Sequence, residues 1–505
     1  MTRTPAEWLK EFDAHLSQVI AEAEVPGAAA CVTWGGEVVY QRGFGWRDRE
    51  ARLPAGPRTV FGLASLSKSF TALVALVLAA KGMWTLDDPV TDHLPEFNYP
   101  GLGSGSEPVR LWHMLSHTSG VPPLRALDYA LRPDQVGDPA HVHYSRRIDD
   151  DPDVSSYDAL MAYLRAGERS PLERPGRIVS YSNECVALVG AAIERVTGKP
   201  FPEVLEAEVL EPLGMLSTTF DIGEARSRGD YAVLYTRTSD GVVRSPAWSR
   251  APAYLGTGML KSSASDLARY LSFMVAGDGA ALGLTPERMA QLTTARAWSQ
   301  PGGGYALGWS VRTHGDVTVV RHGGSLKGVA TCQGFVPELG LGVAVLMNLD
   351  GAPVMRAWYG AVNLALGQAA DAPPYGTGHE LLWAGPSSLE SELGPYAGVY
   401  SSGEPWGRLE LVAQPYAGDP AGAPGRAADG SYLVAYSGDD RERIGRLALL
   451  REPGEQGTLE FVIVGDQGAW DGGRFHLDAV GRPFAVQHGQ RWYDREAPAD
   501  QGRPG

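Results

Sequence analysis

Hydrophobic residues recur with two different periods in the first 370 residues. Apolar positions at helical spacing predict helices over residues 5–23, 65–80, 185–197, 264–275 and 354–366. Short alternating or β-branched stretches predict strands over residues 28–34, 37–42, 305–313, 317–321, 330–336 and 341–348. Because helices at both ends flank strands that are joined by hairpins, we expect an α+β fold with an antiparallel sheet, and not a doubly wound one.

The pattern changes after residue 370. Residues 371–394 are rich in Pro and Gly and predict a linker. Beyond it, turn residues separate eight short strand-like segments: 396–400, 407–412, 431–436, 445–450, 459–464, 474–477, 484–488 and 491–493. We therefore expect an α+β domain over 1–370, a linker over 371–394, and a small antiparallel β-barrel over 395–495.

Residues 122–177 form the least regular part of the first unit. They are polar and Pro-rich, and they include a run of acidic residues at 149–153. A solvated insertion and an excursion over the functional face of the domain both remain open for this segment.

Composition narrows the classes of partner. The chain has 505 residues and a formal net charge of −15, and we find no cluster of Lys and Arg longer than a pair, so nucleic acid is not expected as a partner. The longest apolar run, residues 72–80, is too short to span a bilayer, and the N-terminus lacks the pattern of a signal peptide. We expect a cytoplasmic protein without a membrane partner.

Three widely spaced cysteines, Cys31, Cys185 and Cys332, predict buried free thiols and no disulfide framework.

Lysine is scarce in this chain, since only six of the 44 basic residues are lysines, and one of the six stands three residues after Ser65. A serine in the first turn of a helix sits at the positive end of the helix dipole, and Lys68 lies on the same helical face. The apolar residues that follow place this lysine in a low-dielectric setting, which lowers its pKa and favours a general base. An N-cap serine with a snorkelling lysine is the plain alternative.

Two further motifs could act together with Ser65 and Lys68 in one site. Tyr181-Ser182-Asn183 precedes a predicted helix, where Asn183 is either a substrate ligand or the cap of that helix. His322-Gly323-Gly324-Ser325 follows the strand predicted over 317–321, where paired glycines either let a ligand approach the backbone or form a turn or bulge with a surface histidine. Together the three motifs supply a nucleophile, a base, a proton relay and oxyanion donors.

The chain resembles the serine β-lactamase and penicillin-binding-protein superfamily, in its class C β-lactamase-like branch of esterases and D-amino-acid peptidases. The Ser-x-x-Lys motif is typical of this group. The resemblance covers roughly residues 10–368, and it rests on Val60 to Lys68, Leu115 to Gly120, Pro175-Gly176 through Tyr181-Ser182-Asn183, Gly258-Met259-Leu260 with Ser265-Asp266-Leu267, Arg321 to Gly324, and Val345 to Asn348. The C-terminal segment is similar to the lipocalin-like barrel of some members, where it either narrows the active-site mouth or serves assembly.

The resemblance implies roles for the motif residues. Ser65 would be the acylated nucleophile, Lys68 its base, Tyr181 a partner in the proton relay and Asn183 a substrate ligand. The oxyanion hole would be the backbone N–H groups of Ser65 and Ser325. His322, Gly323 and Gly324 would line the substrate, and the loop from His117 to Gly120 would support the site.

One departure from the family bears on the substrate. His322 and Gly323 stand where the β-lactamases and transpeptidases carry Lys-Thr-Gly, so the ammonium and hydroxyl for a substrate carboxylate are missing. We therefore expect a serine hydrolase that acts on an ester, a small amide or a D-amino-acid peptide bond of a small molecule or short peptide. A β-lactamase or penicillin-binding protein is the first alternative, and a catalytically silent binding protein is the alternative of another class. The oligomeric state stays open.

Two other hydrolase classes are disfavoured. A metal hydrolase would have to use His141 and His143, but no third ligand has metal-like spacing, so neither a metal nor a cofactor is expected. An α/β-hydrolase would need a Gly-x-Ser-x-Gly elbow, which the chain lacks.

Overall fold

A computed structural model provides the structure of the chain. It describes residues 3–103, 107–131, 138, 151–245, 247–374, 393–402, 404, 407–414, 432–438, 441–449, 457–465 and 468–497. Most of the predicted linker over 371–394 lies outside these ranges, as do His141 and His143.

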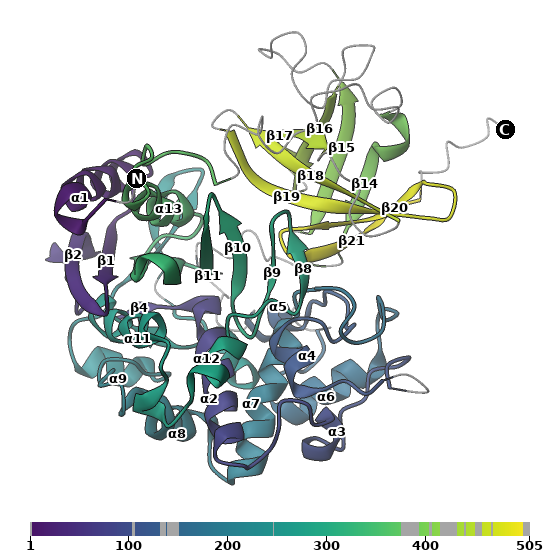
Figure 1. Ribbon diagram of the computed structural model, residues 1–505, viewed down its shortest axis with the longest axis horizontal. Coiled ribbons are helices and arrows are strands. Elements are labelled where there is room, and N and C mark those ends of the chain that lie inside the picture. The colour runs from purple at the N-terminus through teal and green to yellow at the C-terminus, as the bar shows by residue number, and fades with distance from the viewer. Residues whose placement is uncertain are drawn as a thin grey trace.

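The first unit is built on a nine-stranded antiparallel sheet (Figure 1). Its strand order is β3-β2-β1-β13-β12-β11-β10-β9-β8. The strands are β1 (Gly27–Trp34), β2 (Glu37–Asp48), β3 (Leu53–Pro54), β8 (Ala297–Gln300), β9 (Gly303–Tyr305), β10 (Ser310–His314), β11 (Val317–Leu326), β12 (Val329–Val336) and β13 (Leu341–Met347). Pairing of β1 with β13 joins the two ends of this unit, and the expected α+β fold is confirmed.

Helices cover both faces of the sheet, which explains why β12 and β13 are buried along their whole length. α1 (Pro5–Glu22) and α13 (Val354–Ala365) pack over one face. α11 (Ala264–Ala276) packs on the other face, where α2 (Ser67–Ala80) and α7 (Asn183–Thr197) belong to the same core. The remaining α-helices are α3 (Val90–His93), α4 (Leu111–Leu115), α5 (Ala126–Leu131), α6 (Tyr157–Ala166), α8 (Phe201–Leu205), α9 (Ile222–Ser227), α10 (Leu255–Gly258) and α12 (Pro286–Gln291).

Two small strand pairs lie outside the large sheet. β4 (Phe61–Gly62) pairs with β7 (Lys261–Ser262), and β5 (Leu234–Thr238) pairs with β6 (Gly241–Ser245). The first pair matters for function, because it holds the backbone that leads directly into Ser65.

Three details of the sequence prediction are wrong. The single strand expected over 305–313 is two strands, because Gly308 between them has φ +74° and packs against the backbone of Lys68. The strand expected over 317–321 continues to Leu326, so His322 to Ser325 lie within β11. The segment 122–177, expected to be irregular, contains the helices α5 and α6.

The second unit is a closed eight-stranded barrel, as the sequence predicted. Its strands are β14 (Gly398–Ser401), β15 (Arg408–Gln414), β16 (Tyr432–Ser437), β17 (Glu442–Leu449), β18 (Thr458–Gly465), β19 (Gly468–Leu477), β20 (Pro483–His488) and β21 (Arg491–Arg495). β21 pairs with β14 and closes the barrel around a core that includes Tyr400, Leu411, Phe461 and Phe475. In Figure 1 the barrel stands beside the β8 end of the sheet.

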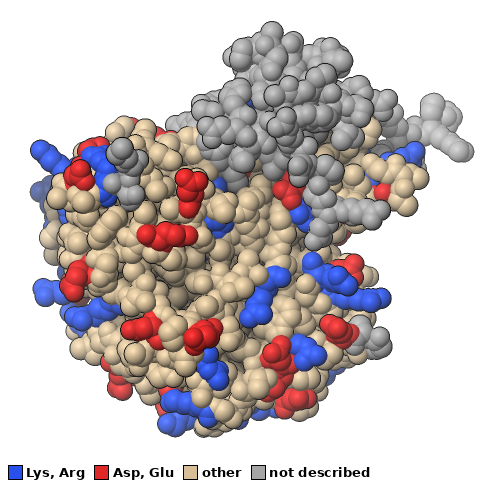
Figure 2. Space-filling model, in the orientation of Figure 1, with Lys and Arg blue, Asp and Glu red and all other residues tan. Residues whose placement is uncertain are grey.

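The cysteines, the lengths of the helices and the surface charges bear on three expectations from the sequence. Cys31, Cys185 and Cys332 are free and buried, which confirms that prediction. None of the described helices is both long and apolar enough to cross a membrane. On the face shown in Figure 2, basic and acidic side chains are interspersed over the α+β unit and do not gather into a stripe of one sign.

The break at Gly308 gives a prediction about stability. Gly308→Ala forces an alanine to φ +74° and places its Cβ 2.7 Å from the carbonyl oxygen of Lys68. The matched control is Gly315→Ala, where φ is +59° but nothing lies within 4 Å. The left-handed conformation alone costs about 1–2 kcal/mol, and overpacking adds about 1–3 kcal/mol. Thermal unfolding should therefore show a clearly lower midpoint for Gly308→Ala than for Gly315→Ala, and equal midpoints would contradict the close approach.

Candidate active site

Ser65 lies in a 3₁₀ turn, Ala64–Leu66, immediately before α2. The preceding Ala64 has φ +48°, a left-handed conformation that costs a non-glycine residue energy and persists only where the surroundings hold it. The sheet supplies that support, since the Thr331 hydroxyl donates to the Leu63 carbonyl at 2.9 Å. The amide of Gln333 also donates to the Ser69 hydroxyl at 3.0 Å. β12 therefore fixes the turn that presents Ser65.

Lys68 is fully buried beside Ser65, as the spacing predicted. Its Nζ lies 3.0 Å from the Ser65 Oγ and 3.0 Å from the Thr257 carbonyl oxygen. Burial is the main reason that the pKa of Lys68 is held well below its usual value, and the positive charge of Arg491 lowers this pKa further. The low pKa favours the neutral amine, which can accept a proton from the serine.

Tyr181 lies beside Ser65 and Lys68. The Nζ of Lys68 lies 4.8 Å from the centre of the Tyr181 ring, and the nearby Ser65 hydroxyl acts on the pKa of the phenol. Burial raises the pKa of Tyr181 to about 12, so the phenol keeps its proton at neutral pH. It can therefore pass a proton along the group without first becoming a phenolate.

His117 supports the backbone around Tyr181, as expected for the loop from His117 to Gly120. The Ser180 N–H donates to the His117 carbonyl at 2.7 Å, and the Ser182 N–H donates to its Nδ1 at 3.2 Å. The His117 ring packs 4.1 Å from the Tyr181 ring, centre to centre. Burial is the main reason that the pKa of His117 lies well below its usual value, so an uncharged imidazole packs against the Tyr181 ring.

Asn183 opens α7, but it does not cap that helix. Ser182 is the N-cap and accepts the Cys185 N–H at 3.2 Å, so the capping alternative for Asn183 is wrong. The Asn183 carbonyl accepts from the Thr257 hydroxyl at 3.0 Å, while its side-chain amide makes no hydrogen bond to any described residue. That amide is half-buried and available to a ligand.

Glu184 is a residue of this site that the sequence did not reveal. Burial raises the pKa of its carboxyl to about 7, and Ser182 donates to it at 3.0 Å. Its negative charge acts on Lys68 and opposes part of the lowering of the lysine pKa. An acidic residue in the first turn of a helix is ordinary, so the sequence carries no signal of this role.

The glycine motif lies on a strand edge that faces the nucleophile turn. β10 pairs with β11 only up to Arg321, so the residues from His322 to Ser325 have β12 on one side and a free edge on the other. Glycine is required at 324, because a Cβ there would lie 2.4 Å from the Leu63 carbonyl oxygen. At Gly323 the nearest atoms would be 3.9 Å away, so that position has room for a side chain.

His322 is buried and fully occupied by protein partners. Its Nδ1 lies 2.6 Å from the Gly323 carbonyl oxygen, to which it can only donate, so Nε2 accepts from the Tyr305 hydroxyl at 2.7 Å. Burial lowers the pKa of His322 to about 3, so the ring is neutral at physiological pH. It therefore brings no positive charge and no free donor to a substrate. Tyr305, which orients this ring, was not identified from the sequence.

The barrel reaches the site through the β20–β21 hairpin. The turn residues Gly489 and Gln490 both have positive φ, as a two-residue hairpin turn requires. The Tyr181 N–H donates to the Gln490 carbonyl at 2.9 Å, and the Gln487 amide donates to the Val179 carbonyl at 2.6 Å. The guanidinium of Arg491 lies 5.2 Å from the centre of the Tyr181 ring. These contacts were missed because they join residues about 300 positions apart, with no local sequence signal.

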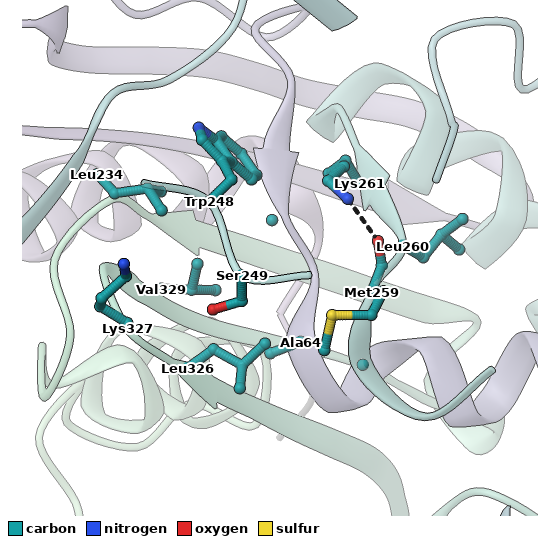
Figure 3. A pocket seen from close by; sticks show the side chains of 12 residues that line it. Ala64, Leu234, Trp248, Ser249, Met259, Leu260, Lys261, Leu326, Lys327 and Val329 are labelled. Atoms are coloured by element: carbon teal, nitrogen blue, oxygen red, sulfur yellow. Dashed lines mark hydrogen bonds between the residues drawn. The ribbon is translucent and has the colours of Figure 1, made fainter. Parts of the chain in front are cut away.

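A pocket of about 270 Å³, partly open to solvent, lies beside the nucleophile turn (Figure 3). Its walls are mainly apolar and include Leu234, Trp248, Leu326 and Val329. Lys261 also lines it and donates to the Met259 carbonyl at 2.8 Å. Ala64 and Leu326, the sequence neighbours of Ser65 and Ser325, line the pocket, whereas Ser65 and Ser325 themselves do not.

The described ranges, 3–131 and 151–497 with the gaps given above and residue 138, include most of the His, Cys, Asp and Glu side chains of the α+β unit. Within them, no group of three or more His, Cys, Asp or Glu side chains could hold a metal ion. His141 and His143 fall in the gap between 138 and 151, so the structure gives them no place relative to the site.

Two known proteins are similar to this chain in sequence. Protein flp from Staphylococcus aureus strain MW2 is 27% identical over 353 residues, which are 69% of this chain and 64% of that protein. Esterase EstB from Burkholderia gladioli is 39% identical over 211 residues, which are 41% of this chain and 50% of the esterase. The chain thus spans half to just under two thirds of these relatives.

Both structural units recur together in a solved structure. The octameric penicillin-binding protein homologue from Pyrococcus abyssi superposes with a TM-score of 0.65 at 26% identity, over 96% of this chain and 99% of that one. The model of the Beta-lactamase family matches residues 12–367, a range that includes Ser65, Lys68, Tyr181, Asn183 and the β11 edge. The chain therefore belongs to the β-lactamase family.

Proposed function

We propose that this protein is a serine hydrolase that forms an acyl-enzyme on Ser65 and cleaves an ester, a small amide or a D-amino-acid peptide bond. The observation that carries the proposal is the 3.0 Å contact between the Ser65 hydroxyl and a buried lysine whose pKa is strongly lowered. A neutral amine in hydrogen-bond reach of a serine is the arrangement that activates this weak nucleophile.

The proposed reaction has two steps. Lys68 accepts the proton of Ser65 as Oγ attacks the substrate carbonyl, and the N–H groups of Ser65 and Ser325 stabilise the negative oxygen that forms. Tyr181 then relays a proton to the leaving group, which departs and leaves the acyl ester on Ser65. A water molecule, activated by the same Lys68–Tyr181 group, hydrolyses that ester and restores the free serine.

Two observations favour an ester or a small amide over a β-lactam. The relative EstB is named an esterase, and the neutral, occupied His322 cannot replace the ammonium that the lysine of Lys-Thr-Gly would supply. Hydrolysis of β-lactams, or a penicillin-binding-protein activity, is the alternative within the same chemistry. The proposal includes a small-molecule or short-peptide substrate, with Asn183 as a ligand to its amide or carbonyl, and a cytoplasmic location.

Covalent labelling separates a hydrolase from a silent binding protein of the same fold. A fluorophosphonate probe should label the wild-type protein and Ser67→Ala, but not Ser65→Ala. Ser67 is the matched control, because its hydroxyl is buried and donates to the Ala64 carbonyl at 2.7 Å, away from the lysine. Absence of labelling in the wild-type protein would favour the binding protein.

Replacement of the base tests the role of Lys68. Lys68→Met keeps an unbranched side chain of similar length in an apolar environment but removes the amine, so the fold should persist while acylation is lost. Hydrolysis of a p-nitrophenyl ester, measured beside circular dichroism, checks both expectations. A folded Lys68→Met protein that keeps most of its esterase activity would exclude lysine as the base.

The relay predicts a smaller loss at position 181. Tyr181→Phe preserves the ring that packs on His117 and removes only the hydroxyl, so turnover should fall by about 10²–10⁴-fold, the usual range for a lost general acid–base. The measurement is kcat on the same p-nitrophenyl ester. An unchanged kcat would show that the proton travels by another route.

A further inference from the structure

The groups of the family motifs leave the substrate-facing side of the site without a positive charge. Burial lowers the pKa of Lys68 well below its usual value and so favours the neutral amine, and His322 is neutral with both ring nitrogens occupied. A carboxylate on the substrate would therefore find no cation in Lys68 or His322, and Arg321 of the same motif donates to the Tyr359 hydroxyl of α13 at 3.1 Å.

The barrel places a cation at this point. Arg491, the first residue of β21, holds its guanidinium 5.2 Å from the centre of the Tyr181 ring, and the Nζ of Lys68 lies 4.8 Å from the same ring. Its side chain is 26% exposed, so it is neither sealed in the barrel core nor fully solvated. Partial desolvation strengthens its interaction with any anion that enters the site.

The guanidinium is held by one edge and leaves donors available. Its Nε donates to the Glu404 carboxylate at 2.6 Å, and Glu404 is itself only 6% exposed. No described residue accepts a hydrogen bond from either terminal nitrogen of Arg491. A planar guanidinium oriented through Nε presents its terminal N–H groups as a fork that fits a carboxylate.

We propose that Arg491 of the barrel is a specificity-determining residue that binds a carboxylate on the leaving-group side of the substrate, with Glu404 as its positioning residue. The leaving-group side follows from Tyr181, because the side chain that hands a proton to the leaving group is the one beside which Arg491 lies. The inference rests on the proposed hydrolase function, and it assigns the cation for a substrate carboxylate to the barrel and not to the position of His322.

Two esters that differ only in charge provide the test. 3-Carboxyphenyl acetate carries a carboxylate on its leaving group, and 3-carbamoylphenyl acetate is its neutral counterpart. The wild-type protein should show a lower KM for the carboxylated ester. Arg491→Gln should raise that KM by about tenfold or more, as expected for a lost hydrogen-bonded charge pair, with little change for the neutral ester.

Two further variants sharpen the comparison. Arg491→Lys keeps the positive charge but not the fork, so it should retain part of the preference. Arg441→Gln is the matched control, because Arg441 is a barrel arginine that is 52% exposed and paired with Glu410, and its loss should leave both esters unaffected. Circular dichroism and thermal unfolding of each variant show that the barrel stays folded.

The outcomes separate this inference from the proposed function. Fluorophosphonate labelling of Ser65 in the same preparations reports on the hydrolase chemistry alone. If labelling succeeds but the wild-type protein shows no preference for the carboxylated ester, the carboxylate site is wrong and the hydrolase stands. If Arg491→Gln lowers activity equally on both esters, Arg491 is structural and the inference is overturned. If Ser65 is not labelled, the proposed function itself fails.

Discussion

The burial of Lys68 beside Ser65 is the constraint on which the rest of the structure depends. An ammonium in this place would lose its hydration and gain no carboxylate partner, so the fold favours the neutral amine. To keep Lys68 buried in this apolar setting, α2 must be packed on every side, and the turn before it must hold Ala64 in a left-handed conformation. This arrangement also requires Gly308 and Gly324, where the backbone approaches Lys68 and Leu63 more closely than a side chain would allow.

The polar groups around this lysine follow the same rule. His117 and His322 are neutral because they are buried, and each is oriented by hydrogen bonds to backbone or to a neighbouring phenol. Glu184 has its pKa raised to about 7 for the same reason. The interior of the site therefore relies on the orientation of its polar groups more than on formal charge, while Arg491 and Glu404 form a charged pair beside it.

The sequence predicted the features that depend on local chemistry. Helical spacing places Lys68 beside Ser65, alternation gives the eight barrel strands, and apolar runs give β12 and β13. The sequence did not predict strand bounds that depend on contacts with backbone far away along the chain. The break at Gly308 comes from contact with Lys68, and the extension of β11 past Arg321 comes from pairing with β12. Arg491, Tyr305 and Glu184 have no local signal, because their importance arises only from what the fold packs against them.

The backbone hydrogen bond between Tyr181 and Gln490 makes the two units thermodynamically linked. Whatever loosens the barrel weakens the placement of the tyrosine, and by reciprocity whatever orders the tyrosine tightens the barrel. A molecule held in the site should then slow the opening of the β20–β21 hairpin, visible as slower amide hydrogen exchange there. Substitutions deep in the barrel core can reach the chemistry by the same route, although none of them touches the substrate. The appended barrel is thus subject to selection through reaction rate as well as through its own stability.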